Sequence, residues 1–238
     1  MNFNATDTQL QIAEMIRDFG NKHIRPNMME WDEQQIFPID VFKKLGELGL
    51  MGVLVPEEYG GSGLGYFEYV TIVSEIAKIC SSIGLSVAAH NSLCVGHILY
   101  FGNEEQKQRL LPKIAEGGLA ALVITEPSAG SDATGMTTTF TEDGDSVIVN
   151  GSKTFISNGD VADIYIVFGK WAGIDGAKEA ITAVVIEKGA PGLSVVSIED
   201  KMGTRASGTA TLAFDQCRIP RTNVLKNPGD GLKILLGS

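Results

Sequence analysis

The sequence has few cysteines, and their arrangement argues against whole classes of protein. Its 238 residues include only Cys80, Cys94 and Cys217. The number is odd, the spacing is wide and no C-x-x-C pair occurs, which favours reduced thiols in a reducing compartment over a disulfide or zinc framework. The three histidines also lack the spacing of metal ligands. We therefore expect no metal site.

Basic residues are also scarce, and long apolar runs are missing. The 19 Lys and Arg face 29 Asp and Glu, a net charge of −10, so we expect neither nucleic acid nor a membrane surface as a partner. No apolar run approaches the ~18 residues of a membrane helix. The first seven residues lack a basic and an apolar region, so we expect no secretory signal. The expected location is the bacterial cytoplasm, with the mitochondrial matrix as second choice.

The hydrophobic pattern changes once, near Gly117-Gly118. Apolar residues before this point recur at helical spacing, whereas later runs are short or alternate, as in strands. No strand–helix–strand alternation occurs, so we expect an α+β fold in which the sheet is an antiparallel barrel or sandwich. The predicted strands are 146–150, 153–157, 163–168, 181–186, 193–198 and 209–214.

Three regions follow from this pattern. We predict an N-terminal helical domain at 1–118, a middle antiparallel β domain at 119–226, and the start of a C-terminal helical domain at 227–238. The last region contains Leu232, Ile234, Leu235 and Leu236 at helical spacing, but no cap and no polar tail. We therefore expect the chain to be a fragment.

The most informative stretch is Ile124-Thr125-Glu126-Pro127-Ser128-Ala129-Gly130-Ser131-Asp132. An apolar run, Leu119 to Ile124, leads into a turn that offers several hydroxyls and backbone N–H groups. Such a loop suits a neutral or anionic heterocyclic ligand held by several weak donors. Glu126 precedes a proline, and we expect it to position the turn.

A second stretch is Gly151-Ser152-Lys153-Thr154-Phe155-Ile156-Ser157-Asn158-Gly159. By itself it is more typical of an ordinary strand with a turn at each end. The functional alternative is that Phe155 lays its ring beside a flat cofactor while Ser157 offers a hydroxyl and an N–H to a ring heteroatom.

These stretches resemble the flavin-binding signatures of the acyl-CoA dehydrogenases, which have G-x-K-x-[W/F]-I-[T/S]-N-G after a Thr-Glu-Pro loop. Three further segments are similar to that family in the same order. They are Gly49-Leu50-Met51-Gly52-Val53-Leu54-Val55-Pro56-Glu57-Glu58-Tyr59-Gly60-Gly61, Phe101-Gly102-Asn103-Glu104-Glu105-Gln106-Lys107, and Lys201-Met202-Gly203-Thr204-Arg205-Ala206-Ser207-Gly208-Thr209-Ala210 with its continuation to Pro220. Details such as Cys217-Arg218-Ile219-Pro220 look closest to the short-chain, butyryl-CoA branch.

The resemblance implies a flavoenzyme that removes an α-proton and a β-hydride from an acyl-CoA thioester. It implies FAD as cofactor, an electron-transfer flavoprotein as electron acceptor, and a tetramer or dimer of the full-length protein. Ser131 also matches a position that touches acyl-CoA in relatives. The residues that the resemblance implies for flavin binding are Leu122, Val123, Ile124, Thr125, Ser131, Phe155, Ile156 and Ser157.

The sequence departs from the family by lacking a second helical domain, which supplies the glutamate base. We therefore assign no catalytic residue within 1–238, and we expect the isolated fragment to have little or no activity. Three alternatives stay open. The chain could be a non-catalytic flavin- or CoA-binding module or partner subunit, a same-fold acyl-CoA oxidase or flavin monooxygenase, or a purely structural protein.

Overall fold

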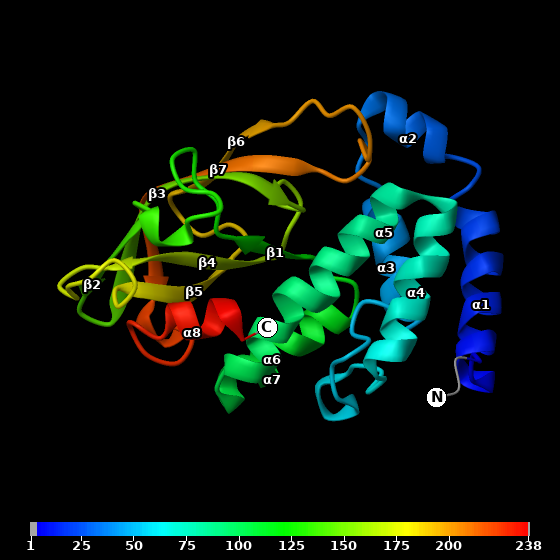
Figure 1. Ribbon diagram of the computed structural model, residues 1–238, viewed down its shortest axis with the longest axis horizontal. Helices are drawn as coiled ribbons and strands as arrows, with labels where there is room; N and C mark the ends of the chain where they lie inside the picture. Colours follow the sequence, from blue (N-terminus) through cyan, green and yellow to red (C-terminus); the bar gives the residue numbers. More distant parts are fainter. Residues whose placement is uncertain (1–3, 238) are drawn as a thin grey trace.

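The computed structural model describes residues 4–237, with helices on one side and a curled sheet on the other (Figure 1). The outermost residues of the predicted domains, 1–3 and 238, lie outside the described residues. The helical part comprises α1 Asp7–His23, α2 Met28–Gln34, α3 Ile39–Glu47, the 3₁₀ turn η1 Glu57–Tyr59, α4 Tyr66–Ile79, α5 Ser81–Ala88, the π-helix η2 Ala89–Val95, α6 Gly96–Phe101 and α7 Glu104–Ala115. The predicted α+β class is confirmed.

Helix starts follow the capping residues in the sequence. Thr6 caps α1 and Asn103 caps α7, each in a reciprocal pair of hydrogen bonds with the glutamine three residues later. The sequence analysis missed α2. Pro26 stands just before it, no side chain caps it, and none of its residues is buried, so neither pattern nor cap marks it.

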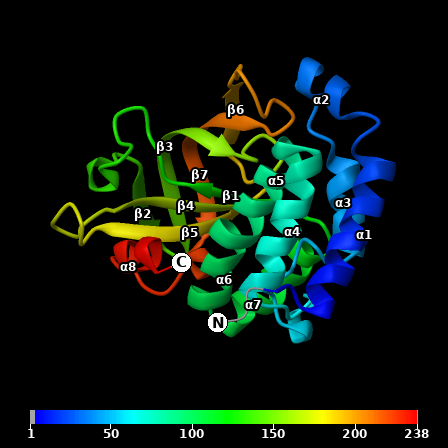
Figure 2. The same ribbon diagram turned by 45° about the vertical axis from the view of Figure 1, so that its right-hand side comes forward.

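The segments α5, η2 and α6 form one continuous helical stretch that corrects our expectation about long apolar runs. Ser81–Phe101 has 21 residues and a mean hydropathy of 1.2, which is long and apolar enough to cross a membrane by length and composition. In the fold, 72% of that window is buried. Figures 1 and 2 show it between the outer helices and the sheet, the place of a core helix.

The sheet has seven strands in the order β1-β4-β2-β3-β7-β6, with β5 paired to β4. The strands are β1 Ala120–Val123, β2 Thr139–Asp143, β3 Ser146–Ser157, β4 Ile164–Trp171, β5 Ile181–Glu187, β6 Leu193–Ile198 and β7 Thr209–Pro220. The expectation of an all-antiparallel sheet was wrong in two places, because β4 runs parallel to both β1 and β2. The chain between β1 and β4 contains a hairpin instead of a crossover helix, so the helical period that marks parallel strands is missing.

Strand β3 is one strand where the sequence analysis expected two. Two bulges interrupt its pairing with β7, between Val149 and Gly151 and between Lys153 and Ile156. A bulge breaks the alternation of side chains, which made one bent strand resemble two short ones. A hairpin turn at Asp143-Gly144 joins β2 to β3, with Gly144 at a φ of +59°.

The short last helix, α8 Gly231–Leu236, packs against β5 beneath the sheet (Figure 1). Its buried Ile234 belongs to a hydrophobic core that joins α6 and α7 to the strands β1, β4 and β5. This cluster therefore joins the helices to the sheet, while a second core lies within the sheet and a third among the N-terminal helices. The turns η3 Ala133–Gly135 and η4 Arg221–Asn223 complete the described chain.

His90, in the π-helix η2, forms hydrogen bonds with two segments outside that helix. Its Nδ1 accepts the N–H of Ala120 at 3.0 Å, so Nε2 carries the proton and donates to the carbonyl oxygen of Met51 at 2.8 Å. The imidazole is fully buried, and this burial lowers the pKa of His90 to about 4. Both ring nitrogens of His90 therefore have hydrogen-bond partners within the fold.

This low pKa predicts a loss of stability in mild acid. In the unfolded chain His90 is protonated below pH ~6.5, whereas in the folded chain it is protonated only below about pH 4. The free energy of unfolding should therefore fall by about 3 kcal/mol as the pH is lowered from ~6.5 to about 4. Denaturant titrations at pH 7.5, 5.5 and 4.5 measure it. We expect His90→Gln to remove about 3 kcal/mol of the fall, and His23→Gln to remove less, because His23 is not fully buried although its pKa is also lowered. An equal fall in both variants would contradict the assignment.

Candidate functional site

The loop after β1 makes a tight elbow around a buried carboxylate. Glu126 and Ala129 exchange two backbone hydrogen bonds of 2.9 and 3.1 Å, which closes the turn through Pro127 and Ser128. The Glu126 side chain is only 3% exposed. It accepts hydrogen bonds from the N–H and hydroxyl of both Thr137 and Thr138, at 2.6 to 2.9 Å. The expected turn-positioning role of Glu126 is confirmed.

Lys153 completes this buried cluster from strand β3. Its Nζ lies 2.9 Å from Glu126 Oε1 and donates to the carbonyl oxygen of Ile124 at 2.8 Å. Burial would raise the pKa of Glu126, but hydrogen bonds from Thr138, Lys153 and Thr137 outweigh it and lower the pKa to about 2. Burial lowers the pKa of Lys153, which Glu126 partly offsets. The carboxylate of Glu126 is therefore ionised at neutral pH.

Phe155 occupies an unusual backbone position in the second bulge of β3. Its φ is +59°, a left-handed conformation that costs a bulky residue free energy. The bulge turns its side chain outward, where the ring is 63% exposed. Within residues 4–237 the ring stacks on no other aromatic side chain. A strained and exposed aromatic side chain points to a binding role.

The elbow and the end of β3 lie side by side. The N–H of Thr154 donates to the carbonyl oxygen of Thr125 at 2.9 Å, and Asn158 Nδ2 reaches the carbonyl oxygen of Ala120 at 3.4 Å. Residues 120–125 therefore run antiparallel along 154–158. These two hydrogen bonds place the elbow next to the end of β3.

Several side chains on this surface have unused hydrogen-bonding capacity. In the part of the chain that the structure describes, the hydroxyls of Thr125, Ser131 and Ser157 have no hydrogen-bond partner. Thr125 and Ser157 are half-buried, and Ser131 is exposed. No contact in the described chain ties Ser131 to the other two, so the structure brings together Thr125, Phe155 and Ser157 and leaves Ser131 on the adjoining loop.

The apolar candidates divide into two groups. Val123 and Ile156 are buried in the core of the sheet, so only their backbone atoms could reach a ligand. Leu122 and Ile124 are half-buried and pack against the core shared with the helices. All eight predicted flavin contacts stay predictions.

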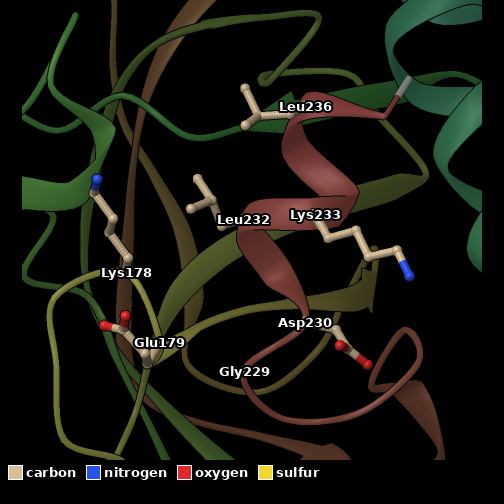
Figure 3. A pocket seen from close by; sticks show the side chains of 7 residues that line it. All are labelled: Lys178, Glu179, Gly229, Asp230, Leu232, Lys233 and Leu236. Atoms are coloured by element: carbon tan, nitrogen blue, oxygen red, sulfur yellow. The ribbon is translucent and has the colours of Figure 1, made fainter.

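Two cavities lie elsewhere among the described residues. One of about 410 Å³ lies between the loop at Lys178 and Glu179 and the helix α8, as Figure 3 shows. Another, of about 450 Å³, lies between α3, α7 and β4. Neither is lined by a candidate residue from the elbow or from the end of β3. Because the surface at 120–131 and 154–158 combines free donors with an exposed ring, we locate the candidate site there.

We also searched the described side chains for a cluster of metal ligands. Among residues 4–237, no group of three or more His, Cys, Asp or Glu side chains could hold a metal ion. The three cysteines are free, and burial raises the pKa of Cys217 to about 11, which disfavours its thiolate.

Comparison with known proteins connects this geometry to a family. The sequence matches the acyl-CoA dehydrogenase N-terminal domain over residues 6–118 and the middle domain over residues 121–217. The chain belongs to the acyl-CoA dehydrogenase family. It is 39% identical over 237 residues to a short-chain-specific acyl-CoA dehydrogenase of Clostridium acetobutylicum, which covers 99% of this chain and 62% of that protein.

Solved structures of this family have the same fold. A chain in a structure described as the electron-transferring flavoprotein of Acidaminococcus fermentans aligns with a TM-score of 0.94 and 43% identity, over 98% of this chain and 62% of that one. An acyl-CoA dehydrogenase complexed with FAD from Bacillus anthracis aligns with a TM-score of 0.91 and 35% identity, over 98% of this chain and 40% of that one. The chain thus spans less than two thirds of these relatives.

Sequence reasoning missed two residues of this acyl-CoA dehydrogenase surface. Lys153 is part of the G-x-K signature, but its charge gave no reason to expect a buried ion pair with Glu126. Asn158 has a φ of +61°, and its side chain also donates to the carbonyl oxygen of Ser86 at 3.3 Å, which ties Ser157's end of β3 to α5. The signal was the Asn-Gly pair, typical of left-handed backbone.

Proposed function

We propose that this chain supplies the flavin-binding surface of an FAD-dependent enzyme that dehydrogenates an acyl-CoA thioester between its α and β carbons. A short acyl chain is the favoured substrate, and an electron-transfer flavoprotein is the favoured acceptor. The observation that carries the proposal is the surface where the free hydroxyls of Thr125 and Ser157 lie beside the strained, exposed ring of Phe155.

The residues present fit a flavin. An isoalloxazine ring has hydrogen-bond acceptors along its edge and two flat apolar faces. Thr125 and Ser157 offer donors for that edge, and Phe155 offers an aromatic face. Ser131, on the adjoining loop, is our proposed contact for phosphate or acyl-CoA atoms. When bound, the flavin would supply the hydride acceptor.

In this proposal, the residues of this chain orient the flavin and exclude water from it. Hydrogen bonds from Thr125 and Ser157 would fix the ring edge, and the half-buried Leu122 and Ile124 would keep solvent from one side. We assign no general base within residues 1–238. The three-part division at 118 and 226, a homotetramer or homodimer, and a bacterial cytoplasmic location belong to the same proposal.

The Ser157 hydroxyl provides the first test. In the protein containing this chain, Ser157→Ala should slow flavin reduction by butyryl-CoA about tenfold or more, because a donor to the ring that accepts hydride is lost. Substrate affinity should change less than about twofold, because the hydroxyl faces the flavin. Stopped-flow reduction measures both. Ser152→Ala, on the same strand, is the control, and an unchanged rate for Ser157→Ala would count against the role.

The same preparation distinguishes the alternatives. An acyl-CoA dehydrogenase should bind FAD, become reduced by the thioester and reoxidise slowly in air but quickly with an electron-transfer flavoprotein. Fast reoxidation by oxygen would favour an oxidase or a monooxygenase. FAD binding without reduction would favour a non-catalytic module, and no FAD binding at all would reject the proposal.

A further inference from the structure

The buried ion pair of Glu126 and Lys153 connects the two halves of the candidate site. Lys153 is fully buried on β3, two residues before Phe155, and Glu126 forms the centre of the elbow. Their side chains join strand and loop directly. Any change in the distance between Glu126 and Lys153 would therefore move the elbow relative to the ring of Phe155.

The pair also determines which backbone groups of the elbow face outward. Lys153 Nζ binds the carbonyl oxygen of Ile124, the N–H of Thr154 binds that of Thr125, and the N–H of Ala129 binds that of Glu126. Three successive carbonyl oxygens are thus satisfied inside the protein. Within residues 4–237, the amide N–H and the hydroxyl of Thr125 have no hydrogen-bond partner.

Stability alone does not explain this arrangement. A buried ion pair costs desolvation free energy, and an apolar pair of similar volume is often at least as stable. Glu126 nevertheless accepts four hydrogen bonds from Thr137 and Thr138 as well as the contact with Lys153. This full satisfaction fixes one geometry for the loop.

We propose that Glu126 and Lys153 are positioning residues that help to turn the carbonyl oxygens of 124–126 inward, so that the amide N–H and hydroxyl of Thr125, and no carbonyl oxygen of 124–126, face the ligand there. Such a backbone favours a ligand edge that is rich in hydrogen-bond acceptors. The inference rests on the proposed function for the identity of that ligand as FAD, but the orientation of the loop is a property of the chain without it.

The test replaces Lys153 in the protein containing this chain. Lys153→Met keeps an unbranched side chain and removes the charge, and Glu126→Gln/Lys153→Met removes both charges so that none is left buried alone. FAD affinity is measured by fluorescence titration, and hydrogen exchange of segment 124–131 is measured in the absence of FAD. Glu75→Gln is the matched control, because Glu75 is a buried carboxylate paired with Arg17 and Lys78 in the helical part.

We expect both Lys153 variants to exchange segment 124–131 at least about tenfold faster and to bind FAD at least about tenfold more weakly, as one lost hydrogen bond to a carbonyl predicts. The control should leave both quantities within twofold. Affinity and exchange that match the control would overturn the positioning role. Failure of the unaltered protein to bind FAD, with exchange still faster in the variants, would instead reject the proposed function and leave the loop geometry standing.

Discussion

Replacing Phe155 by glycine is expected to weaken FAD binding without weakening the fold. Glycine adopts a φ of +59° without strain, so relief of the left-handed conformation should raise the free energy of unfolding by about 1 kcal/mol. The exposed ring makes no aromatic contact in the described chain that would be lost. Loss of one stacked aromatic face should cost about 1–3 kcal/mol of binding, or roughly fivefold to a hundredfold in Kd.

Two measurements on the same variants check this prediction. Denaturant unfolding without FAD gives the stability, and fluorescence titration gives the affinity. Phe155→Leu is the control, because it keeps the strain of a side chain at this φ and removes only the aromatic ring. It should lose affinity without gaining stability. Unchanged affinity in Phe155→Gly would show that the ring does not face the cofactor.

Replacing Glu126 by alanine should destabilise the fold by about 3–5 kcal/mol, since it leaves the charge of Lys153 buried without a partner. It also removes the acceptor for the N–H groups of Thr137 and Thr138. Chemical denaturation at pH 7 measures the loss. Glu142→Ala is the control, because Glu142 pairs with Arg221 on the surface and should cost less than about 1 kcal/mol.

The lowered pKa of Glu126 also predicts how the stability of the fold changes in acid. The folded pKa of Glu126 is about 2, below the ordinary ~4.3 of the unfolded chain. Its stabilising contribution is therefore complete above pH ~4.3 and is lost as the pH falls toward 2. Glu126→Ala should lack this part of the acid response. A loss at pH 7 no larger than that of Glu142→Ala would contradict a buried, ionised Glu126.

Much of the fold follows from local patterns in the sequence. Thr6 and Asn103 mark helix starts because capping is a short-range interaction, and Gly144 marks the hairpin because of its left-handed backbone. The elbow was predicted from an apolar strand followed by hydroxyls. Each of these features depends on residues within a few positions of one another.

Most features that the sequence did not predict depend on interactions between residues far apart in the chain. The parallel pairing of β4 with β1 and β2 depends on how a hairpin inserts between them, which no local period records. The ion pair of Lys153 with Glu126 joins residues 27 positions apart, and lysine is almost never fully buried unless it is paired. The π-helix Ala89–Val95 interrupts a helix whose sequence contains no proline.

The most direct test of the account is a structure of the protein containing this chain with FAD bound. We predict that the isoalloxazine ring lies against residues 122–125 and 155–157, with Ser157 Oγ and a donor of Thr125 within about 3.5 Å of its edge and the ring of Phe155 against one face. An isoalloxazine bound in the cavity beside α8, or anywhere that leaves Thr125, Phe155 and Ser157 without contact, would contradict the account.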